Sequence, residues 1–201
     1  MIKYSNGKSY SPKEIKQKED KKTVSLKRHL SSANRGMDLE GDINASNEYY
    51  KERGLCLITK RPTPINIVKV DYSKGAIITN AYFEKQSTTD YNGVYKGRYI
   101  DFEAKQTKSK TSFPLANIPS QQIDHLKRVL DQGGIAFFII EFVSLDEVFL
   151  LDASYVIHFY ENGDRKSIPH EKFLEIAHKI KRGFAPRLDY LPIVEEIYCK
   201  S

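Results

Sequence analysis

The chain has 201 residues, of which 40% are hydrophobic and 29% charged, a composition typical of one compact domain or of one domain with an appendage. It has neither an apolar run long enough to span a bilayer nor the apolar N-terminal segment of a signal peptide, so we expect a cytosolic protein without membrane attachment. Cys56 and Cys199 lie far apart and outside any CxxC spacing, so we expect neither a structural disulfide nor a zinc site.

The net charge of +6 is unevenly distributed along the chain. Residues 1–36 contain ten Lys and Arg against three acidic residues, and residues 51–110 contain twelve against six. Residues 37–50 contain four acidic residues and no basic one, and residues 111–201 contain ten basic and thirteen acidic residues. Basic surface around carboxylates fits a polyanionic substrate and a metal ion that neutralises the acids. A solvated basic surface without a partner explains the same pattern equally well.

A basic arm and a helix are predicted at the beginning of the chain. Residues 1–33 are polar, rich in lysine and poor in large aliphatic side chains, which indicates a flexible arm ahead of a folded domain at 34–201. A helix is expected from a cap at Asn34 to about Arg53. Glu40 either complements the dipole of this helix or faces the acidic cluster described below as an outer carboxylate.

The following segment is predicted to contain a hairpin. Residues 55–59 have the pattern of a short buried strand, and the prolines of 61–64 indicate a loop. Two alternating segments, 65–70 and 76–83, then surround a turn at 71–75. This hairpin is either ordinary sheet or a projecting ribbon, because it carries the spread basic residues Lys60, Arg61, Lys69, Lys74 and Lys85.

Two aromatic residues near the base of the hairpin have two readings. Tyr82 and Phe83 could stack on nucleic-acid bases, whereas buried aromatic residues of a sheet are the commoner case.

Residues 88–105 form the stretch with the clearest chemical pattern. In an extended chain alternate side chains share a face, so Asp101, Glu103 and Lys105 lie together while Ile100, Phe102 and Ala104 face the core. Asn92-Gly93 is the favoured sequence of a two-residue turn, and Lys96-Gly97 is a second place where the chain can reverse. Either reversal brings Asp90 beside the acidic strand.

A helix with an unexpected amide is predicted next. After a loop at 107–112, a helix runs from 120 to 132, capped by Ser120 and ended by Gly133-Gly134. Gln122 lies within the apolar arc of this helix. A buried amide needs a hydrogen-bond partner or a ligand role, whereas a half-exposed amide in the first turn needs neither, and the pattern favours the latter.

The remaining segments complete an α/β fold with a mixed sheet. The apolar run 135–143 predicts a strand covered on both faces, and 148–151 predicts another strand. A turn is expected at 161–164, followed by helices at 169–180 and 191–198. The five histidines show no metal-ligand spacing, so we expect each to be structural or on the surface.

The acidic stretch contains the parts of a metal-dependent phosphodiesterase. Asp90 and Glu103 supply hard oxygen ligands for Mg²⁺ or Mn²⁺, and such an ion polarises phosphate and lowers the pKa of bound water. Lys105 could orient that water or offset charge that develops on the phosphate. Solvated salt bridges on an exposed strand are the alternative interpretation of these residues.

Six motifs follow one another along the chain: Asn34-Arg35-Gly36-Met37, Lys60-Arg61-Pro62-Thr63-Pro64, Ala81-Tyr82-Phe83, residues 87–105, Thr111-Ser112-Phe113-Pro114-Leu115 and Gly183-Phe184-Ala185-Pro186-Arg187. With the basic arm, they resemble the RecU family of Holliday junction resolvases from low-GC Gram-positive bacteria over nearly the whole chain. That family belongs to the PD-(D/E)xK nucleases, with Thr-Thr-Asp in place of the usual Pro-Asp, a departure that keeps the carboxylate. The resemblance implies a restriction-endonuclease-like α/β fold, with a mixed central sheet flanked by helices and a projecting hairpin stalk at 60–86.

The resemblance also implies the residues of the site. It places Mg²⁺, with Mn²⁺ as a possible substitute, on the ligands Thr88, Asp90, Glu103 and Gln122. Lys105 then stabilises the transition state. Asp101 shares the face of Glu103 on the strand, and we expect it to be an assisting residue of second rank.

The same resemblance implies a homodimer whose two active sites make paired nicks in four-way junction DNA. Recognition is expected to depend on junction shape, because phosphate contacts position a protein without specifying sequence. The expected DNA contacts are the basic arm, Arg35, Lys60, Arg61, Lys74 and Phe83, and recombination and branch-migration proteins are expected partners. Two other functions stay open: a junction-binding architectural protein, and a general or restriction-type nuclease.

Overall fold

The computed structural model describes residues 39–84 and 88–200, which belong to one unit, Asp38–Ser201. Some predictions concern residues outside the described ranges: those for the basic arm, the cap at Asn34, Arg35 and Lys85. No helix in the described part of the chain has the length and apolar character needed to cross a membrane.

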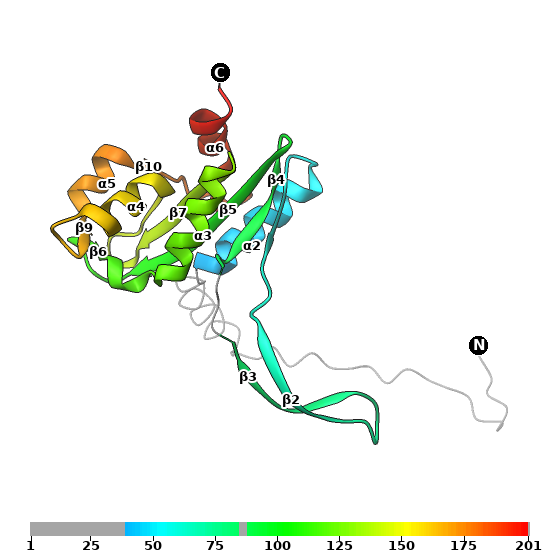
Figure 1. Cartoon of the computed structure of the whole chain (residues 1–201). Coiled ribbons are helices and arrows are strands. Elements are labelled where there is room, and N and C mark those ends of the chain that lie inside the picture. The colour runs from blue at the N-terminus through cyan, green and yellow to red at the C-terminus, as the bar shows by residue number, and fades with distance from the viewer. Residues whose placement is uncertain (1–38, 85–87, 201) are drawn as a thin grey trace, which may run out of the picture. The chain divides into compact units, whose positions relative to one another are not determined.

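A mixed six-stranded sheet organises this unit (Figure 1). In spatial order its strands are β1 (Leu57–Lys60), β4 (Tyr91–Tyr95), β5 (Arg98–Thr107), β7 (Ile135–Phe142), β8 (Glu147–Asp152) and β10 (His178–Lys179). β5 and β7 run parallel, and the other neighbouring pairs are antiparallel. The predicted α/β fold with a mixed central sheet and flanking helices is confirmed.

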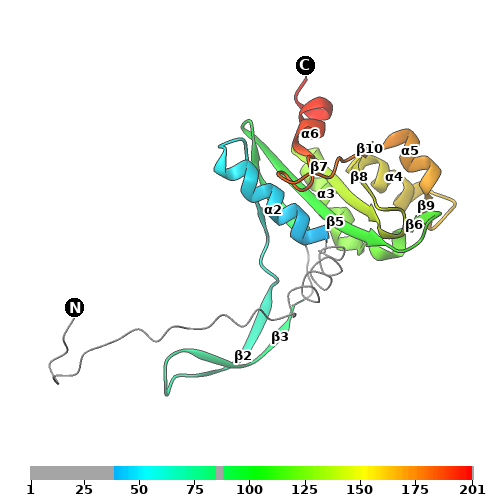
Figure 2. The same cartoon turned by 180° about the vertical axis from the view of Figure 1, so that it is seen from behind.

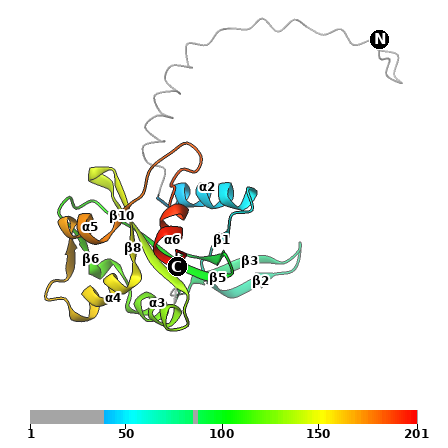
Figure 3. The ribbon, with the colours of Figure 1, turned by 90° about the horizontal axis from the view of Figure 1, so that it is seen from above.

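Helices cover both faces of the sheet. One hydrophobic core includes α2 (Leu39–Glu52) and α6 (Leu191–Tyr198), and Figure 2 shows both helices on the side toward the viewer. A second core includes α3 (Ser120–Asp131), α4 (Ala153–Asn162) and α5 (His170–Ile176). Figure 3 shows α2 on one side of the sheet and α3 on the other.

β7 lies between these two cores, with Phe137 packed into the first and Phe138 into the second. All eight of its residues are buried, which confirms the prediction of a strand covered on both faces.

The predicted hairpin is present as β2 (Ile65–Asp71) and β3 (Ile77–Phe83), which pair antiparallel in a two-stranded sheet. Most of its side chains are exposed. Phe83 is 77% exposed and Tyr82 is 61% exposed, so the interpretation of these two aromatic residues as buried is wrong. Its role as a projecting stalk stays a prediction. A second small sheet pairs β6 (Ser112–Pro114) with β9 (Ser167–Pro169), and short 3₁₀ helices occupy Leu115–Asn117 and Val143–Leu145.

Of the two possible reversal points that the sequence left open, the chain uses Lys96-Gly97 and not Asn92-Gly93. Lys96 and Gly97 have φ values of 49° and 76°, the left-handed backbone of a tight hairpin turn, and they join Tyr95 to Arg98. Gly93 lies inside β4, where an added Cβ would lie 2.0 Å from the backbone oxygen of Leu57. Close packing of β1 therefore accounts for this glycine.

Four local predictions differ from the structure. β1 is the edge strand, so only its Ile58 is buried, whereas we expected a buried strand. Ser120 is the first helical residue of α3, and the cap position belongs to Pro119, whose side chain makes no capping hydrogen bond. The predicted turn at 161–164 begins inside α4. The predicted helix at 169–180 ends at Ile176, because residues 178–179 pair with β8.

Candidate active site

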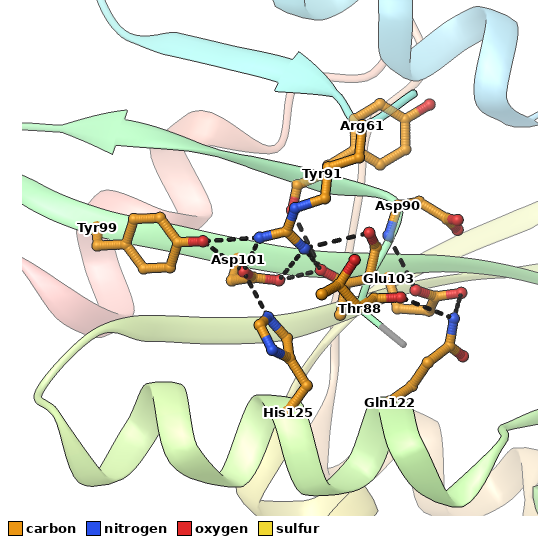
Figure 4. A network of polar contacts seen from close by, with 10 residues as sticks. Arg61, Thr88, Asp90, Tyr91, Tyr99, Asp101, Glu103, Gln122 and His125 are labelled. Atoms are coloured by element: carbon orange, nitrogen blue, oxygen red, sulfur yellow. Dashed lines mark hydrogen bonds and ion pairs between the residues drawn. The ribbon is translucent and has the colours of Figure 1, made fainter. Parts of the chain in front are cut away.

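The hairpin of β4 and β5 places Asp90 beside Glu103 (Figure 4). Tyr91 lies opposite Phe102, so the residue before β4 reaches the strand position of Glu103. The backbone N–H of Asp90 donates to Oε2 of Glu103 at 3.0 Å. Oδ2 of Asp90 accepts a longer hydrogen bond, of 3.4 Å, from the backbone N–H of Ala104. The juxtaposition that the sequence predicted is therefore present, and the role of these carboxylates as ligands stays a prediction.

Glu103 is a fully buried carboxyl group at the centre of the cluster. Its Oε1 accepts from Nζ of Lys105 at 2.5 Å and from Nε2 of Gln122 at 2.8 Å. Burial raises the pKa of Glu103 from 4.5 to about 8, while the Lys105 charge opposes this rise and the Asp90 charge adds to it. A bound cation would stabilise the charged form of such a group.

Gln122 reaches the cluster from α3, where it is 3% exposed. Its Nε2 lies 3.5 Å from the backbone oxygen of Thr88 in addition to its hydrogen bond with Glu103. Its Oε1 is buried and has no hydrogen-bond partner within the described residues. The prediction that the Gln122 amide is half-exposed is therefore wrong. The position of Gln122 within the apolar arc of the helix correctly indicated that it is buried.

This donor set fits a divalent metal ion. Carboxylates and neutral oxygens are the ligands that hard cations prefer, and the partnerless amide oxygen of Gln122 would gain a partner from such an ion. Within residues 39–84 and 88–200, no group of three or more His, Cys, Asp or Glu side chains is placed to hold a metal. A site built on Asp90 and Glu103 therefore needs the neutral oxygens of Thr88 and Gln122 to complete it.

A second buried acid, Asp101, lies on the same face of β5 and takes part in a separate network. Its Oδ2 contacts Nη2 of Arg61 at 2.7 Å, the hydroxyl of Tyr99 at 2.7 Å and Nε2 of His125 at 2.9 Å. Burial and the neighbouring carboxylate raise the pKa of Tyr99, which keeps its hydroxyl protonated as a donor.

A family model described as "RecU: Recombination protein U" matches residues 34–196. The chain belongs to the RecU family. Relatives from Geobacillus sp. (strain WCH70) and Geobacillus kaustophilus (strain HTA426) are 50% and 49% identical to it, and each match covers 98% of both chains. A relative from Bacillus subtilis (strain 168) is 48% identical over 98% of this chain and 96% of its own length. Each of the three is named Holliday junction resolvase RecU.

The DNA contacts that the RecU resemblance implied do not all lie near the cluster. Lys60 forms an ion pair with Glu40. Glu40 lies in the first turn of α2, where an acidic side chain complements the helix dipole. The side chain of Arg61 is 18% exposed and is directed toward Asp101. Lys74 is exposed in the turn of the β2–β3 hairpin. The predicted DNA contacts of this part of the chain stay predictions: Lys60, Arg61, Lys74 and Phe83.

Sequence reasoning missed His125 and Thr89 in this RecU-family site. His125 follows Gln122 by three residues, so both side chains project from one face of α3 toward the sheet (Figure 4). That spacing was available in the sequence, whereas the contact of Thr89 with Asp101 depends on the register of β4 and β5.

Proposed function

We propose that this protein is a Mg²⁺-dependent endonuclease that resolves four-way (Holliday) DNA junctions by paired symmetric nicks during homologous recombination and repair. The observation that carries the proposal is the meeting of Asp90, Lys105 and Gln122 around the buried carboxyl group of Glu103. The names of the relatives support the substrate, because these proteins match the chain over nearly its whole length.

Four residues would hold the metal ion: Thr88, Asp90, Glu103 and Gln122. When bound there, Mg²⁺ would polarise a phosphate oxygen and lower the pKa of a water ligand. Mn²⁺ accepts the same oxygen donors and would serve as a substitute. The hydrogen bonds that join Asp90 and Gln122 to Glu103 bring the donor groups together before an ion arrives.

Lys105 is the positive group of the site. Its ammonium contacts Glu103, and its side chain is 20% exposed, so it borders both the buried carboxylate and the solvent from which DNA approaches. We assign it the stabilisation of charge that develops on the scissile phosphate. Lys105→Ala should slow cleavage about a hundred- to a thousandfold, by analogy with removal of an oxyanion-hole donor. Lys127→Ala, which removes an exposed lysine of α3, is the matched control.

A homodimer fits the task, because a four-way junction has near two-fold symmetry and two active sites can cut paired strands. The exposed residues Lys74 and Phe83 of the hairpin, together with Arg35 and the arm at 1–33, would contact the junction. Recombination and branch-migration proteins would be partners of such an enzyme. Mixing wild type with Asp90→Asn tests the dimer, because mixed dimers should release singly nicked junctions.

The decisive experiment compares Mg²⁺-dependent cleavage of a mobile four-way junction with cleavage of linear duplex of the same sequence. Wild type should cut the junction, and Asp90→Asn should bind it without cutting it. Tight junction binding without cleavage by wild type would support an architectural protein and refute the enzyme. Equal cleavage of the linear duplex would support a general nuclease.

A further inference from the structure

Three separate segments supply the proposed metal ligands, and one polar network joins all three. Thr88 and Asp90 belong to the segment before β4, Glu103 belongs to β5, and Gln122 belongs to α3. Because these three segments are separate in sequence, tertiary contacts set the distances between the ligands. The network around Asp101 lies beside them on the same face of β5 (Figure 4).

Arg61 holds the segment before β4 by its backbone and by its side chain. Its backbone N–H donates to the backbone oxygen of Asp90 at 2.7 Å. Its Nη1 donates to Oγ1 of Thr89 at 2.7 Å and to the backbone oxygen of Thr89 at 3.2 Å. These contacts fix the position of Asp90, a proposed ligand, and of Thr89, which lies between the proposed ligands Thr88 and Asp90.

Asp101 connects Arg61 to the other two segments. It lies two residues before Glu103 on β5, and it accepts from both Nη atoms of Arg61, at 2.7 Å and 3.4 Å. It also contacts Nε2 of His125, one turn after Gln122 on α3. Asp101 is fully buried, so its hydrogen bonds restrain the positions of Arg61 and His125.

The oxygens of Asp101 are already engaged. Oδ1 accepts from Thr89 and from Nη1 of Arg61, and Oδ2 accepts from Nη2 of Arg61 and contacts Tyr99 and His125. A carboxylate that is held in this way acts through its neighbours, since each of its lone pairs has a donor nearby.

We infer that Asp101, with Arg61 and His125, is a positioning residue that sets the metal affinity of the site by holding its three ligand-bearing segments in register. The inference rests on the proposed function, because it concerns the proposed metal ligands. Substitution of such outer partners in metal sites lowers metal affinity about 10- to 100-fold. Asp101→Asn should therefore bind Mg²⁺ about 10- to 100-fold more weakly, and saturating Mg²⁺ should restore most of its cleavage rate.

The test measures Mg²⁺ binding to the full chain without DNA, by titration calorimetry and by the Mg²⁺-induced rise in melting temperature. Wild type, Asp101→Asn and His125→Asn are compared. His125→Asn breaks only the link to α3 at a part-exposed side chain, so it should fold even if Asp101→Asn does not. It should weaken Mg²⁺ binding severalfold. Asp42→Asn is the matched control, because Asp42 is another buried acid held by two arginines, Arg182 and Arg187.

Weaker binding by Asp101→Asn and His125→Asn, with wild-type binding by Asp42→Asn, supports the inference, and so does recovery of cleavage at high Mg²⁺. Wild-type affinity in His125→Asn and in folded Asp101→Asn would overturn it. An equal loss of affinity in Asp42→Asn would overturn it too, since the effect would then reflect general destabilisation. Wild type that fails to bind Mg²⁺ would instead refute the proposed metal site, and the inference with it.

Discussion

Gln122 donates its amide hydrogen to the buried carboxyl of Glu103 at 2.8 Å, which joins α3 to β5 at the centre of the candidate site. The two residues are 19 positions apart in sequence. One side of the amide is engaged by this hydrogen bond, while its oxygen has no partner in the described part of the chain. The pair therefore combines a structural contact with a group that is available to a ligand.

Gln122→Met should separate these two roles. The variant loses one hydrogen bond but also removes a buried oxygen without a partner, so the free energy of unfolding should change by no more than about 1 kcal/mol. Mg²⁺ affinity should fall at least about tenfold, which corresponds to about 1.4 kcal/mol of binding. Calorimetric titration with Mg²⁺ and denaturant unfolding measure the two quantities.

Gln121→Met is the control, because the neighbouring amide is partly exposed and lies on another side of α3. Unchanged Mg²⁺ affinity in Gln122→Met would show that the amide is not a ligand.

The raised pKa of Glu103 predicts a pH-dependent stability for the metal-free protein. The carboxyl ionises near 4.5 in the unfolded chain and near 8 in the folded protein, because burial penalises the charge. Between these values the folded state holds a proton that the unfolded state has lost, so stability falls as pH rises, by at most about 1.4 kcal/mol per pH unit. Glu103→Gln removes this titration.

Unfolding of wild type and Glu103→Gln should be compared in a chelator at about pH 5 and about pH 8, which bracket the window. The variant should gain stability relative to wild type at the higher pH. A variant that loses stability with pH as steeply as wild type would contradict the assignment of the raised pKa to Glu103.

Gly93→Ala should destabilise the sheet edge. A Cβ at this position would lie 2.0 Å from the Leu57 oxygen and 2.6 Å from the Cα of Ile58, which are backbone atoms of β1. Forcing β1 away from β4 should cost about 1–3 kcal/mol, the usual scale of overpacking. Denaturant unfolding measures the loss.

Gly97→Asn provides the comparison, because a Cβ at Gly97 meets no atom within 4 Å and asparagine tolerates its left-handed backbone. An equal loss of stability in both variants would show that β1 packing is not the reason for glycine at position 93.

Phe83→Ala should weaken junction binding without affecting the fold. The side chain is 77% exposed, so its removal should change unfolding stability by less than about 0.5 kcal/mol. Loss of stacking on a base should cost about 1–3 kcal/mol of binding. Gel-shift or anisotropy titrations with a four-way junction, at one fixed salt concentration, measure the change. Wild-type junction affinity would refute the assigned contact.

The elements predicted well are those whose local pattern and tertiary environment agree. The unbroken apolar run at 135–142 has one favourable place, a central strand between two cores, and it lies there as β7. The alternation of Asp101, Glu103 and Lys105 likewise predicted their common face, because side chains on a strand alternate whatever surrounds it. Figure 4 shows Asp101 and Glu103 on one side of β5, and Lys105 contacts Glu103. The resemblance to the RecU family added Gln122 to that group.

The sequence by itself thus determined the α/β class, the central strand and the membership of the acidic cluster, since these follow from periodicity and residue type. Only the tertiary structure decided where the chain reverses. Glycine is required at position 93 by the close approach of the β1 backbone, and not by a turn. The tertiary structure alone also buried Gln122 against Glu103 and joined Arg61 and His125 to Asp101. These contacts form between segments distant in the chain, and no local pattern encodes the register that brings them together.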